Sequence, residues 1–231
     1  MINITCKMPV EREPWNIPFA RRVHTVLSAA NSGKKVALML YRCADTSTFR
    51  YRCYNVYQAT SESSSWQSMY FFLPEIETVE RLLSSCNLLI LTRVKWSYAL
   101  NALVMKAKKM HIPVLFDVDD LICNIKYLPL LTNTLNVHFG SEIDYDFWFA
   151  DISRHEATAA MADGFITTNP YLGEKLSEHF GKPYQIIVNS LNKEQLRISE
   201  LCRNAKNGKR NKRPYTIGYF SGTPSHINDF R

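Results

Sequence analysis

The sequence predicts an α/β protein whose sheet is parallel and carries helices on both faces. Two observations support this fold class: short, continuous apolar runs recur along the chain, and amphipathic helical patterns lie between them. Strands that are apolar throughout are typical of parallel sheets with both faces buried, and their alternation with helices predicts an α/β sheet covered on both faces. Such sheets bind ligands beyond the carboxyl ends of their strands, so functional residues are expected in the loops that follow the strands.

Five apolar runs are expected to form the strands. They are VALMLY at 36–41, LLILT at 88–92, IPVLF at 112–116, FITT at 165–168 and QIIV at 185–188. One further helix is expected before the first strand, in the segment IPFARRVHTVLSAANSG. Arg21 and Arg22 of this helix could contact a membrane surface, but packing of the helix on the domain is the favoured interpretation.

Helical patterns fill the intervals between the runs. The segment 74–86 begins with Pro74, and the segment 96–110 gathers lysines at its C-terminal end, where the helix dipole favours cations. The segment 169–181 has Asn169 as an expected N-cap and Gly181 as an expected stop. Further helices are expected around His155, which is interpreted as a structural histidine, and over 193–207.

Composition and charge exclude several classes of protein. With 231 residues, 46% of them apolar, the chain can build a globular core. The net charge of +7 is local, because residues 203–213 hold six cations and no acid, which leaves 7 − 6 = +1 elsewhere. Such a run is typical of a solvated linker, so no nucleic-acid partner is expected. No apolar run approaches the roughly 18 residues of a membrane span, and the charged N-terminus does not resemble a signal peptide. We expect a cytoplasmic protein with at most peripheral contact at the inner face of the cell membrane.

The loop after the first strand contains candidate anion-binding residues. Ser47 or Thr48 can cap a helix whose first turn carries Arg50 and Arg52. Cations are disfavoured at a helix start, so their presence there needs a reason. One reason is an anion such as phosphate; the other is that these arginines reach solvent or pair with an acid elsewhere.

Three acids follow the run 112–116. Asp117, Asp119 and Asp120 lie within four residues and repel one another, so a positive or hydrogen-bonding group is expected nearby. A divalent metal is one candidate, but use of Asp119 or Asp120 in catalysis or in orienting an acceptor is favoured over metal binding. The six cysteines are scattered, with no spacing typical of a metal site or a disulfide framework.

Five segments, taken in order, resemble bacterial glycosyltransferases of the GT-B fold, of the family 1 and family 4 type. They are TFRYRCYNVYQA, VLFDVDDLI, ADGFITTNPYLGEKL, IIVNSLN and IGYFSGTPSHINDF, and the resemblance covers about positions 36 to 231. It implies two Rossmann-like domains, one for the acceptor and one for the donor. It also implies transfer of a sugar from a nucleoside-diphosphate sugar, the co-substrate, to a cell-surface glycan or a lipid-linked acceptor, with no metal or other cofactor.

The resemblance also implies roles and domain boundaries. It makes Asp119 and Asp120 catalytic. Its acceptor- or phosphate-binding residues are Ser47, Thr48, Arg50 and Arg52, and its donor-side residues are Asn189, Gly222, Thr223 and His226. The expected domains are an N-terminal extension at 1–35, an acceptor-side domain at 36–202, a basic interdomain linker at 203–214, and the first strand and loop of a truncated donor-binding domain at 215–231. The chain alone is therefore expected to be weakly active or inactive.

Two other interpretations stay open. The chain can be a non-catalytic binding or assembly module that pairs with a separate donor-binding subunit or with another copy of itself. A phosphoryl-receiver-like domain that uses the Asp cluster is weaker, because receivers place their acidic pair after the first strand and need a lysine at a later strand end.

Overall fold

A six-stranded parallel sheet forms the centre of the part of the chain that the structure describes. The computed structural model describes residues 13–45, 47–134 and 139–207. The strands are β1 Lys35–Tyr41, β2 Trp66–Phe72, β3 Leu88–Thr92, β4 Val114–Val118, β5 Gly164–Thr167 and β6 Tyr184–Ile186. Every neighbouring pair is parallel, in the order β2-β1-β3-β4-β5-β6. The predicted fold class, a Rossmann-like parallel sheet covered by helices, is confirmed.

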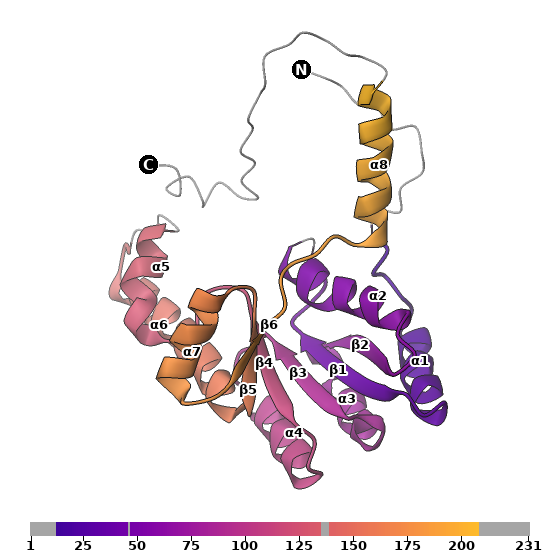
Figure 1. Ribbon diagram of the computed structural model, residues 1–231. Coiled ribbons are helices and arrows are strands. Elements are labelled where there is room, and N and C mark those ends of the chain that lie inside the picture. The colour runs from indigo at the N-terminus through magenta and orange to yellow at the C-terminus, as the bar shows by residue number, and fades with distance from the viewer. Residues whose placement is uncertain (1–12, 46, 135–138, 208–231) are drawn as a thin grey trace.

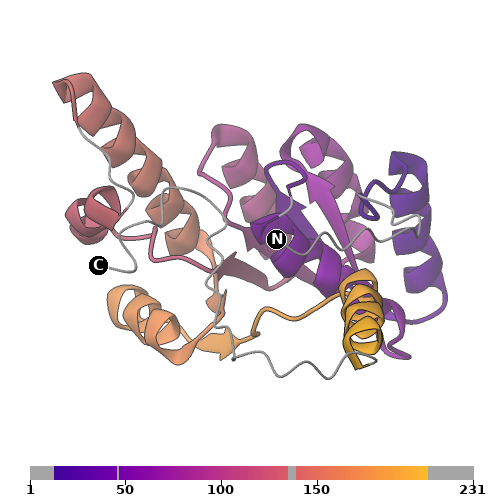
Figure 2. The same cartoon turned by 90° about the horizontal axis from the view of Figure 1, so that it is seen from above.

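The described residues form eight α-helices, of which the last projects away from the sheet (Figure 1). They are α1 Phe19–Asn31, α2 Asn55–Ser61, α3 Ile76–Leu82, α4 Tyr98–Lys109, α5 Leu128–Thr134, α6 Glu142–Met161, α7 Pro170–Phe180 and α8 Lys193–Asn207. Shorter turns are the π-helical η1 Arg50–Tyr54 and the 3-10 turns η2 Leu73–Glu75, η3 Leu83–Ser85 and η4 Ile125–Tyr127. Figure 1 shows α2 above the sheet and α3 and α4 below it. Figure 2 shows α1 (indigo) at one end of the sheet and α5 and α6 (rose) at the other.

The strand order creates a switch point between β1 and β3. The chain leaves β1 toward β2 on one side and then returns past β1 to β3 on the other. Right-handed crossovers place the β1–β2 connection and the β2–β3 connection on opposite faces of the sheet. The loops that follow β1 and β3 therefore diverge. A crevice opens between such loops at the carboxyl ends of the strands, and ligands of open α/β sheets bind there.

Strand β2 is an edge strand that the apolar pattern does not predict. Its start holds Gln67 and Ser68, which interrupt the apolar run but are buried. Their polar groups are satisfied locally: Gln67 Nε2 donates to Ser68 O at 2.9 Å, and Thr60 Oγ1 on α2 accepts from Ser68 N at 2.9 Å. A buried polar residue needs such partners, and the sequence pattern alone does not reveal them.

The other expected strands and helices form with shifted bounds (β6 ends at Ile186 and not at 188), and helix α5 is not expected from the sequence. Strand β4 spans 114–118 instead of 112–116, so Asp117 lies inside the sheet and not beyond it. Helix α7 begins and ends as expected, with Asn169 Oδ1 accepting from Leu172 N at 2.9 Å and Gly181 at a φ of 66°. Helix α8 runs to Asn207, so residues 203–207 of the expected linker are helical, while 208–231 lie outside the described residues.

Helix α1 packs against β1 and β2, as the favoured interpretation expects. Arg22 is buried, and its guanidinium forms an ion pair with Glu75 at 2.6 Å and donates to Tyr70 O at 3.2 Å. These contacts tie the N-terminal extension to the sheet and keep Arg22 away from any surface. Within the described part of the chain, no helix combines the length and the apolar character needed to cross a membrane.

Candidate functional site

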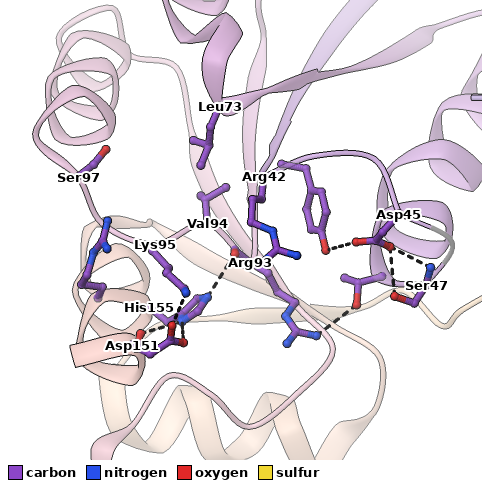
Figure 3. A pocket seen from close by; sticks show the side chains of 13 residues that line it. Arg42, Asp45, Ser47, Leu73, Arg93, Val94, Lys95, Ser97, Asp151 and His155 are labelled. Atoms are coloured by element: carbon purple, nitrogen blue, oxygen red, sulfur yellow. Dashed lines mark hydrogen bonds and ion pairs between the residues drawn. The ribbon is translucent and has the colours of Figure 1, made fainter. Parts of the chain in front are cut away.

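A cavity of about 360 Å³ lies at the carboxyl ends of β1 and β3, at the switch point of the sheet. Its walls come mainly from the loop after β1, the loop after β3 and the middle of α6, and Leu73 of η2 adds to them from the segment after β2 (Figure 3). The lining residues are Tyr41, Arg42, Asp45, Ser47, Thr48, Leu73, Arg93, Val94, Lys95, Ser97, Asp151, Arg154 and His155. Its position agrees with the rule that functional residues follow the strands.

Asp45 shapes the wall that follows β1. Its Oδ1 accepts from the backbone N–H groups of Ser47 and Phe49 at 2.9 and 3.0 Å, and its Oδ2 accepts from the Tyr41 hydroxyl at 2.8 Å. The prediction that Ser47 or Thr48 caps the following helix is therefore corrected, because the carboxylate of Asp45 does so. Burial, together with Asp45, raises the pKa of Tyr41, which stays a neutral donor. Ser47 and Thr48 are left to line the cavity.

Thr48 connects this wall to the acids that follow β4. Its hydroxyl donates to Asp119 Oδ2 at 3.0 Å and accepts from Arg93 Nη1 at 3.2 Å. The same Arg93 nitrogen contacts Asp119 Oδ1 at 3.0 Å and Asp120 Oδ2 at 2.6 Å. Three of the predicted site residues therefore meet, and Arg93 supplies the positive group that the clustered acids need. The side chain of Asp119 is 16% exposed and that of Asp120 is 55% exposed.

Arg93 occupies a special backbone position. It has a φ of 46°, in the left-handed region, where a side chain other than that of glycine is unfavourable. Its backbone N–H donates to Asp117 O at 2.9 Å, which extends the β3–β4 ladder to the edge of the cavity. Burial lowers the pKa of Arg93, but the charges of Asp119 and Asp120 outweigh it, so that pKa is raised. Strained backbone of this kind is concentrated at functional sites.

Helix α6 forms the third wall. Lys95 pairs with Asp151, and Arg154 Nε donates to Trp96 O at 2.8 Å while Trp96 N donates to Arg154 O at 2.9 Å. The ring nitrogens of His155 lie 3.0 Å from Asp151 O and 3.3 Å from Arg93 O. Burial lowers the pKa of His155, and Arg93 and Lys95 add to this effect. His155 lines the cavity, but its ring is engaged by backbone carbonyls, as expected of a structural histidine.

Arg52 has a structural role, which corrects its assignment to the anion-binding loop. Its side chain is 1% exposed, and its Nε donates to Asp117 Oδ1 at 2.9 Å. Its Nη1 contacts Ile187 O and, at 3.3 Å, Asn189 Oδ1 in the segment after β6. The alternative interpretation, in which this arginine pairs with an acid elsewhere in the chain, is therefore confirmed for Arg52. Burial, only partly opposed by Arg52, raises the pKa of Asp117 to about 7.

The other predicted residues lie apart from the cavity lining. Arg50 stacks on the ring of Tyr51, with its guanidinium carbon 4.8 Å from the ring centre. Asn189 is exposed, and its side-chain oxygen accepts from Arg52 Nη1 at 3.3 Å. The donor-side candidates Gly222, Thr223 and His226 lie outside the described residues.

Sequence reasoning did not select several residues that line the cavity. Arg93 and Lys95 follow the run 88–92, so the strand-end rule could have found them. Asp151 and Arg154 carry no such signal, because α6 reaches the cavity only through tertiary packing. Among the residues that the structure describes, no group of three or more His, Cys, Asp and Glu side chains could hold a metal ion. That no metal takes part stays a prediction.

Comparisons with known proteins do not assign a family. No protein-family model and no curated protein match the chain. Among solved structures, the X-ray structure of ornithine transcarbamoylase from Giardia lamblia is similar over 74% of this chain, at 11% sequence identity and a TM-score of 0.28. The chain spans 64% of the length of that structure. A similarity this low supports no inference about function.

Proposed function

We propose that this chain is the acceptor-side domain of a GT-B-type sugar transferase. Such an enzyme passes a sugar from a nucleoside-diphosphate sugar to a hydroxyl of a cell-surface glycan or a lipid-linked acceptor. The observation that carries the proposal is the 3.0 Å hydrogen bond between Thr48 and Asp119. It joins two segments, 71 residues apart in the sequence, that the resemblance assigns to the acceptor. They meet beside a cavity at the switch point of the sheet, where ligands of this fold class bind.

The acids are arranged to receive a hydroxyl group. Asp119 is held by Thr48 and Arg93, while Asp120, on the same arginine, is the more exposed carboxylate. In the proposed reaction the acceptor oxygen attacks the anomeric carbon and its proton passes to Asp120. The bond from that carbon to the diphosphate breaks, and the leaving diphosphate takes the electron pair. Asp119 is a positioning residue that fixes the loop of Asp120.

The size of the cavity agrees with a sugar acceptor. Its volume of about 360 Å³ lies in the range of roughly 300–1,000 Å³ that small-molecule sites occupy. Ser47 and Ser97 supply hydroxyl groups at its walls, and Tyr41 and Leu73 supply carbon surface. Hydroxyl, carboxylate and aromatic groups together suit the polar edges and apolar faces of a sugar ring.

Binding measurements with the full chain test this proposal. One panel holds neutral sugars (glucose, galactose, N-acetylglucosamine and their disaccharides); the other holds UDP and UDP-glucose. We expect saturable binding of at least one neutral sugar, weakened about tenfold by Thr48→Val and by Asp119→Asn, since each loses hydrogen bonds of this cluster. Thr25→Val, on α1 and outside the lining of the cavity, is the matched control. Binding of UDP-glucose that depends on Thr48, with no neutral sugar bound, would contradict the acceptor role.

An assembly module is the second candidate function. Apolar side chains are exposed along the segment that leaves the sheet after β6 and along α8, which stands apart from the domain in Figure 1. They are Ile187, Val188, Leu191, Leu196 and Leu201. Light scattering on the wild type and a Leu191→Ser/Leu196→Ser variant tests it. Concentration-dependent association that the variant loses supports a module built on this surface, and equal masses at all concentrations contradict self-association.

A further inference from the structure

The charged residues that line the cavity are unequally engaged. Four cations and two acids line it. Arg93 pairs with Asp119 and Asp120, and Lys95 pairs with Asp151. The second lining acid, Asp45, is engaged by two backbone N–H groups and the Tyr41 hydroxyl. Both lining acids and two of the four cations therefore have partners.

Arg42 and Arg154 are the two remaining cations. Arg42 follows β1 directly and is exposed, and Figure 3 shows its side chain between Lys95 on one side and Asp45 on the other. Within the described ranges, Arg42 has no hydrogen-bond or ion-pair partner. Arg154 uses Nε for the carbonyl of Trp96 but has no acid partner in the same part of the chain. Two guanidinium groups on different walls thus border one cavity without a carboxylate to balance them.

We propose that this cavity binds a phosphate group carried by the acceptor, with Arg42 and Arg154 as its ligands. The inference rests on the proposed acceptor role and adds the chemical class of the acceptor. Guanidinium groups match phosphate because their N–H groups form parallel, charge-assisted hydrogen bonds to its oxygens. Two positive charges also match the charge of nearly −2 that a phosphate monoester carries at neutral pH, whereas a carboxylate carries only −1.

The position of the two arginines places the phosphate away from the reacting hydroxyl. Thr48 lines the cavity and donates to Asp119, which follows β4 and lies outside the lining, whereas Arg154 belongs to α6 and reaches the loop after β3. A sugar phosphate can therefore direct its phosphate toward Arg42 and Arg154 and a ring hydroxyl toward Asp120. Ser97 can donate to the phosphate, because its oxygen accepts from Leu100 N and its own proton is available.

Calorimetric titration of the full chain with glucose 6-phosphate, glucose and UDP tests the inference. We expect glucose 6-phosphate to bind at least about tenfold more tightly than glucose, because charge-assisted hydrogen bonds to a phosphate contribute that much. Arg42→Gln and Arg154→Gln should each remove most of this preference. Arg81→Gln, which removes an exposed arginine of α3, is the matched control and should keep the preference. Raised salt should weaken binding of the phosphate but not of glucose.

A second arm distinguishes the source of the phosphate. Phosphatidylcholine vesicles with and without a polyprenyl-diphosphate-linked sugar, whose diphosphate carries two negative charges, are floated with the wild type and with both variants. Binding only to the vesicles with the linked sugar, lost in Arg42→Gln and Arg154→Gln, supports a lipid-linked phosphate, and binding of glucose 6-phosphate supports a soluble one. Equal binding of glucose and glucose 6-phosphate, with no vesicle binding, overturns the inference but leaves the acceptor role standing. Binding of UDP with neither sugar nor vesicles bound overturns both.

Discussion

Arg52 Nε donates a hydrogen bond to Asp117 Oδ1 at 2.9 Å, and both side chains are almost wholly buried. The same guanidinium contacts Ile187 O and Asn189 Oδ1, so it joins the end of β4 to the segment that follows β6. Asn55 continues the connection by donating to Ser190 O at 2.6 Å. The turn at 50–55 therefore holds the chain that leaves the sheet, next to the candidate site but outside its cavity.

Substitution of Arg52 should lower the free energy of unfolding and should not weaken the binding of a ligand. At pH 8, where the Asp117 carboxyl is ionised in the wild type, Arg52→Met leaves it buried without its partner, which costs about 3–5 kcal/mol of unfolding free energy. Arg50→Met is the matched control, because Arg50 mainly contacts Tyr51; it should cost below about 1 kcal/mol. Urea unfolding followed by circular dichroism measures both. Unchanged stability with lost phosphate binding in Arg52→Met would restore the anion-binding role.

The Asp117 carboxyl should make stability fall with rising pH. Its pKa is raised to about 7, so between its unfolded pKa near 3.9 and pH 7 the folded chain binds more protons than the unfolded chain. The stability that Asp117 contributes is thus present below about pH 4 and lost by about pH 7. An Arg52→Met/Asp117→Leu variant lacks this titration but keeps all the other acids and histidines. The difference in unfolding free energy, variant minus wild type, should increase from pH 5 to pH 8. A difference that stays constant would disprove the assignment of this pH dependence to Asp117.

The helix that follows β1 should depend on Asp45 for its N-terminal cap and not on the Ser47 or Thr48 hydroxyl that the sequence indicates. Asp45→Ala loses the acceptor for the N–H groups of Ser47 and Phe49, and loss of such a cap costs about 1–2 kcal/mol. Ser47→Ala removes only a hydroxyl that donates to Asp45 at 3.2 Å, so it should cost below about 0.5 kcal/mol. Thermal unfolding of both variants makes the comparison. Equal effects would return the capping role to Ser47.

The pattern of apolar residues predicts a strand correctly wherever the buried residues of that strand are also apolar. The runs at 36–41 and 88–92 became β1 and β3, because their side chains lie between two layers of helices. Strand β2 was missed because Gln67 and Ser68 are buried yet polar. The buried polar groups of Ser68 are satisfied by Thr60 of α2, a tertiary contact that no local sequence pattern encodes.

The candidate site was predictable only where it follows the strands. Thr48 and Asp119 were selected because each lies near the end of an apolar run, and the structure brings them together. Arg52 also follows an apolar run. It lies in the π-helical turn η1, however, and its buried side chain contacts Asp117 instead of lining the cavity. The contribution of α6 depends on contacts such as that of Arg154 with Trp96, 58 residues away, which no local pattern encodes.

Gly173 should be required for the packing of α7 on β6. A Cβ added there would overlap the ring of Tyr184, so Gly173→Ala must displace the ring or the helix. Overpacking of this kind costs about 1–3 kcal/mol, although alanine is the better helix former. In a Tyr184→Ala background the overlap is absent, and the same substitution should instead stabilise the protein slightly. Urea unfolding of the two single variants and the double variant measures the coupling, and purely additive effects would show that the ring does not restrict this position.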